Sequence, residues 1–174
     1  MKHLRQLRSC TVSAPKRFAR VNGLICAELR VVAIPGALRK ASTNNGLLRA
    51  AAQVVPDGMH VVQADISQLP LYNDDLWASG IPESVVNFRE QINSADALLF
   101  SVPEYNYSLP GPMKNAIDWA SKNPNVFAGK PATMLGQYMV PTPWHACLAM
   151  HLQVISSVQV GSVFCSHYAC THRV

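Results

Sequence analysis

The sequence predicts an α/β fold in which a doubly wound parallel sheet carries helices on both faces. Short β-branched segments alternate four times with segments of helical periodicity, and strands that are connected through helices run parallel. The third strand-like segment, ALLFSV at 97–102, is apolar without interruption, as expected for a strand that is covered on both faces.

The spacing of apolar residues predicts the elements of the first half. The run ELRVVAI (28–34) predicts the first strand, and NNGLLRAAAQVV (44–55) has apolar residues at helical spacing. MHVVQAD (59–65) predicts the second strand, after a turn at Asp57-Gly58. The segment 68–80 follows neither period, so we expect an irregular connection there.

The second half continues the alternation. A helix is expected over 81–96, where Pro82 suits the first turn, and the third strand follows at 97–102. The helix expected over 112–121 has apolar residues at the i, i+3, i+4 and i+7 positions of one face: Met113, Ala116, Ile117 and Ala120. KPATMLG (130–136) predicts a fourth strand.

The net charge of +5 comes from the first residues. Residues 1–27 hold six Lys and Arg and no acid, whereas residues 28–174 hold nine basic and ten acidic residues. A nucleic-acid surface should be basic on the folded domain, so no nucleic acid is expected as a partner. The 1–27 arm suits either an organellar targeting peptide or a basic tail.

The five cysteines are an odd number without regular spacing, which indicates reduced thiols in an intracellular protein. We therefore expect a cytoplasmic protein, or an organellar one if the 1–27 arm is a targeting peptide. Four residues near the end of the chain are of zinc-ligand type, but their compressed spacing does not match a zinc finger, and no metal site is predicted: Cys165, His167, Cys170 and His172.

The loop PGALRKASTNNG (35–46) joins the first strand to the first helix. In doubly wound sheets, ligands bind outside the carboxyl ends of the strands. A helix start with hydroxyl and amide side chains and one fixed cation, Arg39, suits a phosphate monoester. The alternative is an ordinary turn in which Ser42, Thr43 or Asn44 caps the helix.

The loop PEYNYSLPGP (103–112) follows the third strand and should lie beside the first loop. Its prolines make it stiff, and Tyr105 and Tyr107 offer ring faces to a flat ligand. A flat heterocycle with a terminal phosphate, such as flavin mononucleotide (FMN), would use both loops. Considered one at a time, Tyr107 and Trp119 also fit core residues at the rim of the sheet. Glu104, considered alone, also fits an acidic side chain exposed to solvent.

Together, GALRKAST (36–43) and PEYNYSLPGPMKNAIDWAS (103–121) resemble the NADPH-dependent FMN reductase family, in its quinone and chromate reductase branch. The resemblance runs from about residue 29 to 136. It implies a flavodoxin-like sheet of order 2-1-3-4-5, whose fifth strand is not clearly marked in this sequence. It also implies noncovalent FMN, homodimers or homotetramers, and two-electron reduction of quinones or similar acceptors by NAD(P)H.

By position, the resemblance implies a phosphate loop and a flavin-ring loop in this chain. The implied cofactor-binding residues are Arg39, Ser42 and Asn44 in the first loop, and Pro103, Glu104, Tyr105, Asn106 and Tyr107 in the second. Ala37 stands where the family usually has Ser, which removes a hydroxyl from the phosphate cradle. No catalytic side chain is expected, because the cofactor performs the chemistry.

We therefore divide the chain into the 1–27 arm, a flavodoxin-like FMN-binding domain over 28–136, and a C-terminal part over 137–174 that departs from the family pattern. Three interpretations of this last part stay open: unrelated sequence from an altered reading frame or splice, a divergent end with 152–164 as fifth strand, or a membrane segment at 146–165. Polar residues argue against the membrane segment. A noncatalytic, truncated protein with weak or no flavin binding is the alternative function.

Overall fold

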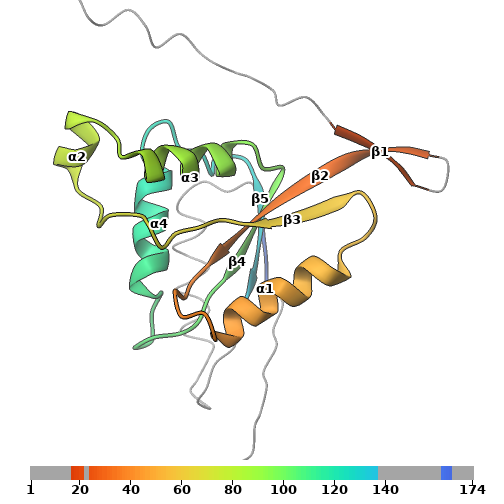
Figure 1. Cartoon of the computed structure of the whole chain (residues 1–174), viewed down its shortest axis with the longest axis horizontal. Helices are drawn as coiled ribbons and strands as arrows, with labels where there is room; N and C mark the ends of the chain where they lie inside the picture. Colours follow the sequence, from red (N-terminus) through yellow and green to blue (C-terminus); the bar gives the residue numbers. More distant parts are fainter. Residues whose placement is uncertain (1–16, 22–23, 137–161, 166–174) are drawn as a thin grey trace, which may run out of the picture.

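The computed structural model describes residues 17–21, 24–136 and 162–165 of the chain. A sheet lies at its centre, with helices packed on either side (Figure 1). The order of the parallel strands is β3-β2-β4-β5-β6. Counted from the first parallel strand, this is the order 2-1-3-4-5, so the predicted flavodoxin-like topology is confirmed.

Six strands are present among the described residues, and the predicted strands are found within a few residues of their expected bounds. They are β1 (Arg17–Val21), β2 (Leu24–Pro35), β3 (Met59–Gln63), β4 (Ala97–Ser101), β5 (Pro131–Leu135) and β6 (Ser162–Cys165). The last of these lies at the end of the segment 152–164 that was one candidate for a fifth strand, and it pairs in parallel with β5.

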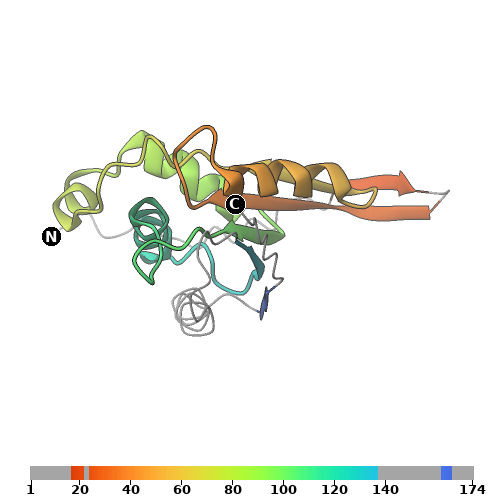
Figure 2. The ribbon, with the colours of Figure 1, turned by 90° about the horizontal axis from the view of Figure 1, so that it is seen from below.

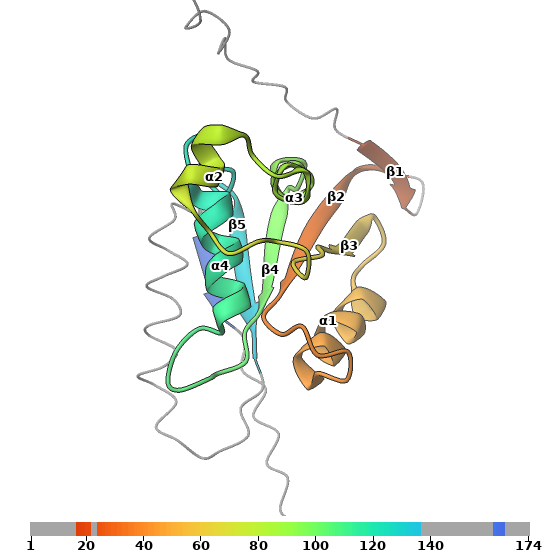
Figure 3. The same ribbon diagram turned by 60° about the vertical axis from the view of Figure 1, so that its left-hand side comes forward.

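Within the described ranges, four helices connect the strands. They are α1 (Thr43–Val54), α2 (Asp74–Ser79), α3 (Glu83–Asn93) and α4 (Gly111–Ser121). Helix α1 lies on one side of the sheet, while α3 and α4 lie on the other, so the prediction of helices on both faces is confirmed (Figure 3).

Each face of the sheet has its own hydrophobic core, because successive side chains of a strand point to opposite faces. Val32 and Ile34 of β2 pack with buried residues of α3 and α4. Val31 and Ala33 pack with Leu48 of α1 on the other face. The four apolar residues predicted to line one face of α4 are all buried: Met113, Ala116, Ile117 and Ala120.

Strand β2 begins four residues earlier than predicted and forms an antiparallel hairpin with β1. The hairpin projects beyond the rest of the sheet (Figure 2). Part of the 1–27 arm therefore forms paired strands. The predicted boundary between the arm and the domain, at residue 28, did not anticipate this hairpin. The function of the 1–27 arm stays a prediction.

The irregular connection predicted over 68–80 is wrong, because it contains helix α2. The side chain of Asn73 caps this helix by accepting a hydrogen bond from the Asp75 amide. Asp74 and Asp75 then occupy the first turn, where negative charge is favourable, and Gly80 ends the helix. Only six residues are helical, too few for the apolar periodicity that reveals longer helices.

Arg89 is buried on α3, as is its neighbour Phe88. The guanidinium donates hydrogen bonds to four backbone carbonyls at and beyond the end of α4: those of Trp119, Ala120, Lys122 and Pro124. Burial lowers the pKa of Arg89 from its ordinary value. The side chain thus satisfies carbonyls that the helix end leaves without partners.

Candidate functional site

The loops that follow β2 and β4 meet at the carboxyl edge of the sheet, as the sequence predicted. The Gly36 amide donates a hydrogen bond to the carbonyl of Ser101, at 2.7 Å. A Cβ atom at Gly36 would lie 2.5 Å from the Pro103 ring and 2.6 Å from the Ser101 carbonyl oxygen. Glycine is therefore required for this close approach, which fixes the first loop against the second.

The first loop is held from within by a residue that the sequence analysis did not single out. Asn45 is 8% exposed, and its amide nitrogen donates to the carbonyls of Ala37 and Arg39 at 3.1 and 3.2 Å. Its side chain thereby closes the turn before α1. The sequence contained a signal for this role, since Asn side chains often hydrogen-bond to nearby backbone in turns.

Ser42 and Asn44 are both buried at the start of α1. Ser42 is the residue before the helix, but its hydroxyl makes no capping hydrogen bond. Asn44 accepts hydrogen bonds from the Ser101 hydroxyl through its backbone carbonyl at 2.8 Å and through its side-chain oxygen at 3.4 Å. Asn44 therefore connects the first loop to the end of β4.

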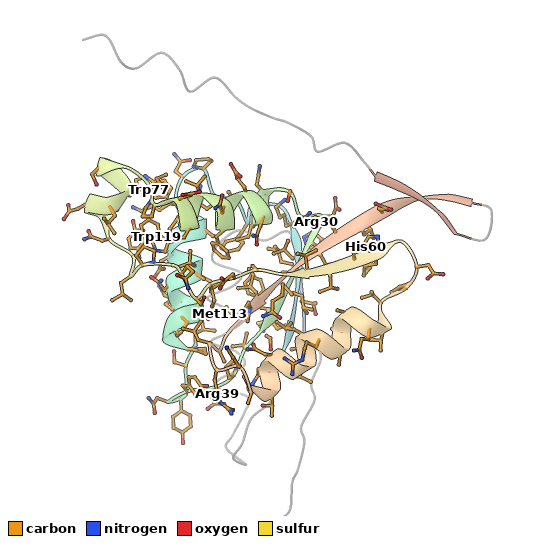
Figure 4. The ribbon with its side chains drawn as sticks, viewed as in Figure 1. Arg30, Arg39, His60, Trp77, Met113 and Trp119 are labelled. Atoms are coloured by element: carbon orange, nitrogen blue, oxygen red, sulfur yellow. The ribbon has the colours of Figure 1, made fainter. Side chains whose placement is uncertain are left out.

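Arg39 lies on the same rim and is exposed (Figure 4). Its backbone carbonyl accepts hydrogen bonds from the Ser42 amide and from Asn45. Within the described part of the chain, its guanidinium has no hydrogen-bond or ion-pair partner. The side chain is therefore available to an anion bound at the start of α1.

The second loop contains a tight turn of strained geometry. Tyr105 and Ser108 exchange two backbone hydrogen bonds, at 3.2 and 3.0 Å. The two residues between them have positive φ angles, 52° for Asn106 and 59° for Tyr107. Positive φ at both central residues is typical of type I′ turns, which favour Asn followed by Gly. A tyrosine in this conformation costs about 1–2 kcal/mol, and such strain tends to occur at functional sites.

The turn presents two aromatic rings to solvent. Tyr105 is 54% exposed and Tyr107 is 59% exposed, so the interpretation of Tyr107 as core is wrong. The same interpretation is right for Trp119, which is fully buried and donates from its indole nitrogen to the Pro70 carbonyl. The exposed rings can therefore contact a ligand, whereas Trp119 belongs to the core under the rim.

Pro103 and Glu104 form the inner part of the second loop. Pro103 is buried against Gly36. Glu104 is half-buried, and its Oε2 atom is enclosed without a hydrogen-bond partner among the described residues. It is therefore not a fully solvated acid, and this oxygen can accept a hydrogen bond from a ligand.

The third loop of the rim begins at Gly136, which is buried directly after β5. Residues 137–161 and 166–174 lie outside the described residues, and they include most of the divergent C-terminal part. Of the Cys and His residues near its end, Cys165 is the last residue of β6, whereas His167, Cys170 and His172 lie outside the described residues. Within the described ranges, no helix is long and apolar enough to cross a membrane. The same ranges contain no group of three or more His, Cys, Asp or Glu that could hold a metal ion.

Comparisons with known proteins agree with this geometry. The family model described as NADPH-dependent FMN reductase matches residues 29–170. An NAD(P)H-dependent FMN reductase of Pseudomonas aeruginosa is 54% identical over 110 residues, covering 63% of this chain and 60% of its own length. An NADPH:quinone oxidoreductase of Arabidopsis thaliana is 49% identical over 111 residues, covering 62% of this chain and 57% of its own length.

Solved structures are similar as well. The flavoenzyme FerB, an NAD(P)H:acceptor oxidoreductase from Paracoccus denitrificans, has 37% sequence identity and a TM-score of 0.68, with 77% of this chain and 74% of that chain covered. An NAD(P)H:quinone oxidoreductase from Methanothermobacter marburgensis has a TM-score of 0.66 at 17% identity, with 82% and 85% covered, and shows the shared fold.

The extent of the match matters for function. The chain spans about 60% of the length of the curated relatives that it matches. The family model nevertheless extends to residue 170, past residue 136 where the resemblance was expected to end.

Proposed function

This chain belongs to the NADPH-dependent FMN reductase family, and from that membership we propose that it is an FMN-dependent NAD(P)H oxidoreductase. Its acceptor would be a quinone or a similar small molecule that takes two electrons. The observation that carries the proposal is the contact between the two loops. The hydrogen bond from the Gly36 amide to the Ser101 carbonyl holds the first loop, which suits a phosphate, against the second loop, which carries Tyr105 and Tyr107.

The residues at this rim fit FMN. The start of α1 carries no side-chain cap, and Arg39 extends beside it without a partner among the described residues. Both features suit a terminal phosphate. We assign Arg39, Ser42 and Asn44 to the phosphate end, Ser42 by its hydroxyl and Asn44 by holding the loop against Ser101.

The second loop would receive the flavin ring. Pro103, Glu104, Tyr105, Asn106 and Tyr107 are assigned to it. The unpaired Oε2 of Glu104 is an acceptor for a ring N–H. The strained turn holds the two tyrosine rings outward in a fixed arrangement.

The chemistry that FMN supplies when bound is the acceptance of a hydride from NAD(P)H and its delivery as two electrons to an acceptor. The protein binds and orients the reactants, and the rim requires no acid–base pair of side chains for this. Homodimers or homotetramers, which the family resemblance implied, remain a proposal.

A flavin titration tests the proposal. The full chain should quench the fluorescence of FMN and not that of FAD, because a helix start with one Arg suits a monophosphate. Arg39→Ala should weaken FMN binding, and Arg39→Lys should restore little of it, because an ammonium cannot make two parallel hydrogen bonds to a phosphate. Loss of one charge-assisted bond corresponds to about 1.5–3 kcal/mol.

Quinone reduction by NADPH in the FMN-loaded protein then tests the reaction itself. A well-folded chain that binds no FMN would support the noncatalytic alternative. Equal binding of FMN and FAD would contradict the assignment of the first loop to a terminal monophosphate.

A further inference from the structure

A recess lies at the amino edge of the parallel sheet, opposite to the edge where the two loops meet. It has a volume of about 460 Å³, and its lining comes from β2 and from the second half of α3: Arg30, Asn87, Glu90, Gln91 and Ser94. Figure 4 shows Arg30 toward the opposite end of β2 from Arg39. Ligand pockets start at about 300 Å³, so a small molecule fits here away from the candidate flavin site.

The periodicity of the two elements brings these side chains together. Arg30 lies on the same face of β2 as Val32 and Ile34, which belong to the core under α3, because alternate residues of a strand share a face. Residues 87, 91 and 94 are spaced four and three apart, so they share one face of α3. The floor of the recess is therefore a strand residue, and its wall is one helix face.

Two buried polar atoms at this recess lack partners. The Nε atom of Arg30 and the Oε1 atom of Gln91 are both enclosed, and neither has a hydrogen-bond partner among the described residues. One atom is a donor and the other is an acceptor. Buried polar groups normally have a partner, so this pair suits a ligand that offers an acceptor and a donor at once.

The recess also contains one charge of each sign. The Arg30 guanidinium and the Glu90 carboxylate both line it, yet neither forms an ion pair with another described residue. A further acid, Asp96, already accepts a hydrogen bond from the Arg30 backbone amide at 2.8 Å. The planar guanidinium fits a ligand carboxylate. An ammonium group, which has three donors, fits Glu90 and the free oxygen of Gln91.

We propose that this recess binds a free α-amino acid, with its carboxylate on Arg30 and its ammonium group on Glu90 and Gln91. An α-amino acid carries both charges on one carbon atom, so each charge of the recess gains an opposite partner. A simple anion would be opposed by Glu90, and a simple cation by Arg30. Asn87 and Ser94 are polar, uncharged and exposed at the rim, which suits a side chain like that of glutamine.

An NMR titration of the ¹⁵N-labelled full chain with L-glutamine tests the proposal, because this method detects weak binding and locates it. The backbone amides of the lining residues should shift, with and without saturating FMN. Two analogues serve as comparison ligands: 4-carbamoylbutanoate is glutamine without its amino group, and 4-aminobutanamide is glutamine without its carboxylate. Each should bind at least about tenfold more weakly, the loss expected for one charge-assisted hydrogen bond.

Two variants assign the contacts. Arg30→Gln should weaken L-glutamine binding about tenfold or more, and it should leave 4-aminobutanamide binding unchanged, because that analogue lacks the group that Arg30 contacts. Glu90→Gln should weaken L-glutamine binding and leave 4-carbamoylbutanoate binding unchanged. The matched controls are Arg49→Gln and Glu83→Gln, which make the same changes of charge at exposed residues outside the recess. Both should leave L-glutamine binding unchanged.

Three results would overturn the proposal: no shift of the lining residues in the folded chain, equal binding of L-glutamine and 4-carbamoylbutanoate, or equal effects of each variant and its control. Circular dichroism establishes that the variants are folded. If Arg30→Gln does not fold, the comparison of Glu90→Gln with Glu83→Gln decides the question. The inference does not depend on the proposed function, since a chain that binds no FMN but binds L-glutamine through Arg30 would contradict the flavin assignment alone.

Discussion

Replacing Gly36 by Ala should separate the two loops of the rim. The new Cβ would lie 2.5 Å from the Cδ atom of Pro103 and 2.6 Å from the Ser101 carbonyl oxygen. Neither a proline ring nor a strand carbonyl can move aside as the end of a flexible side chain can. The loops must therefore shift apart, and the 2.7 Å hydrogen bond from the Gly36 amide to Ser101 is lost.

The size of the effect follows from these contacts. Overpacking of a buried site costs about 1–3 kcal/mol, and loss of the hydrogen bond adds about 1 kcal/mol. The free energy of unfolding should thus fall by about 2–4 kcal/mol. For a protein of this size, each kcal/mol shifts Tm by about 2–4 °C, so thermal unfolding should occur about 5–15 °C lower. FMN binding should weaken at least about tenfold, the equivalent of about 1.4 kcal/mol.

Gly46→Ala is the control. Gly46 lies inside α1, and a Cβ there would meet only the end of the Arg49 side chain, at 3.6 Å. Alanine in a helix interior is more favourable than glycine by about 0.5–1 kcal/mol, so this variant should be as stable as the parent or more stable. If Gly36→Ala unfolds at the temperature of the parent and binds FMN equally well, the contact between the loops does not hold the site together.

Three further predictions concern other parts of the molecule. Arg89→Met should lower the free energy of unfolding by about 2–4 kcal/mol in urea titrations, because it leaves buried carbonyls at the end of α4 without donors; a loss below 1 kcal/mol would show that water replaces the guanidinium. The Lys122 ammonium and the Tyr72 hydroxyl hold the pKa of Asp74 below its ordinary value, so their stabilisation is present above about pH 4 and lost as the pH falls through the folded-state pKa. Asp74→Asn should therefore lower Tm slightly at pH 7 and leave it unchanged near pH 2, and equal shifts at both pH values would contradict this. Tyr107→Gly should maintain or raise Tm, because Gly relieves the positive φ of 59°, yet it should weaken the quenching of FMN fluorescence; a clear drop in Tm would show that the ring packs on the fold.

The sequence predicted the central fold because its signals were long and regular. The uninterrupted run at 97–102 and the helical spacing of Met113, Ala116, Ile117 and Ala120 each extend over several residues. The structure buries all of them except Ala97, which is half-buried. The meeting of the two loops followed from topology, since the carboxyl ends of parallel strands lie on one edge.

Short or context-dependent features were missed. Helix α2 has six residues and was detectable only through Asn73 and the two acids that follow it. The hairpin of β1 and β2 was hidden in a basic segment, although Asn22-Gly23 in the sequence is a strong hairpin signal. The burial of Arg89 could not be inferred, because its four carbonyl partners lie 30 to 35 residues away.

The exposure of the Tyr107 side chain could also not be predicted from the sequence. A tyrosine between an apolar strand and a helix can lie on either side of the rim, and its positive φ depends on the hydrogen bonds between Tyr105 and Ser108. Asn45 was overlooked for a similar reason, because its neighbours in the same loop offered equally polar side chains.

The alternation of residues along β2 also affects how the protein unfolds. Val31 and Ala33 belong to the core on the α1 side, while Val32 and Ile34 belong to the core on the α3 and α4 side. Strand β2 therefore contributes side chains to both cores, which form the two layers of the fold. If either layer loosens, one side of that strand becomes exposed to water. The two layers cannot melt independently, so the described body should behave as one cooperative unit with a single calorimetric transition.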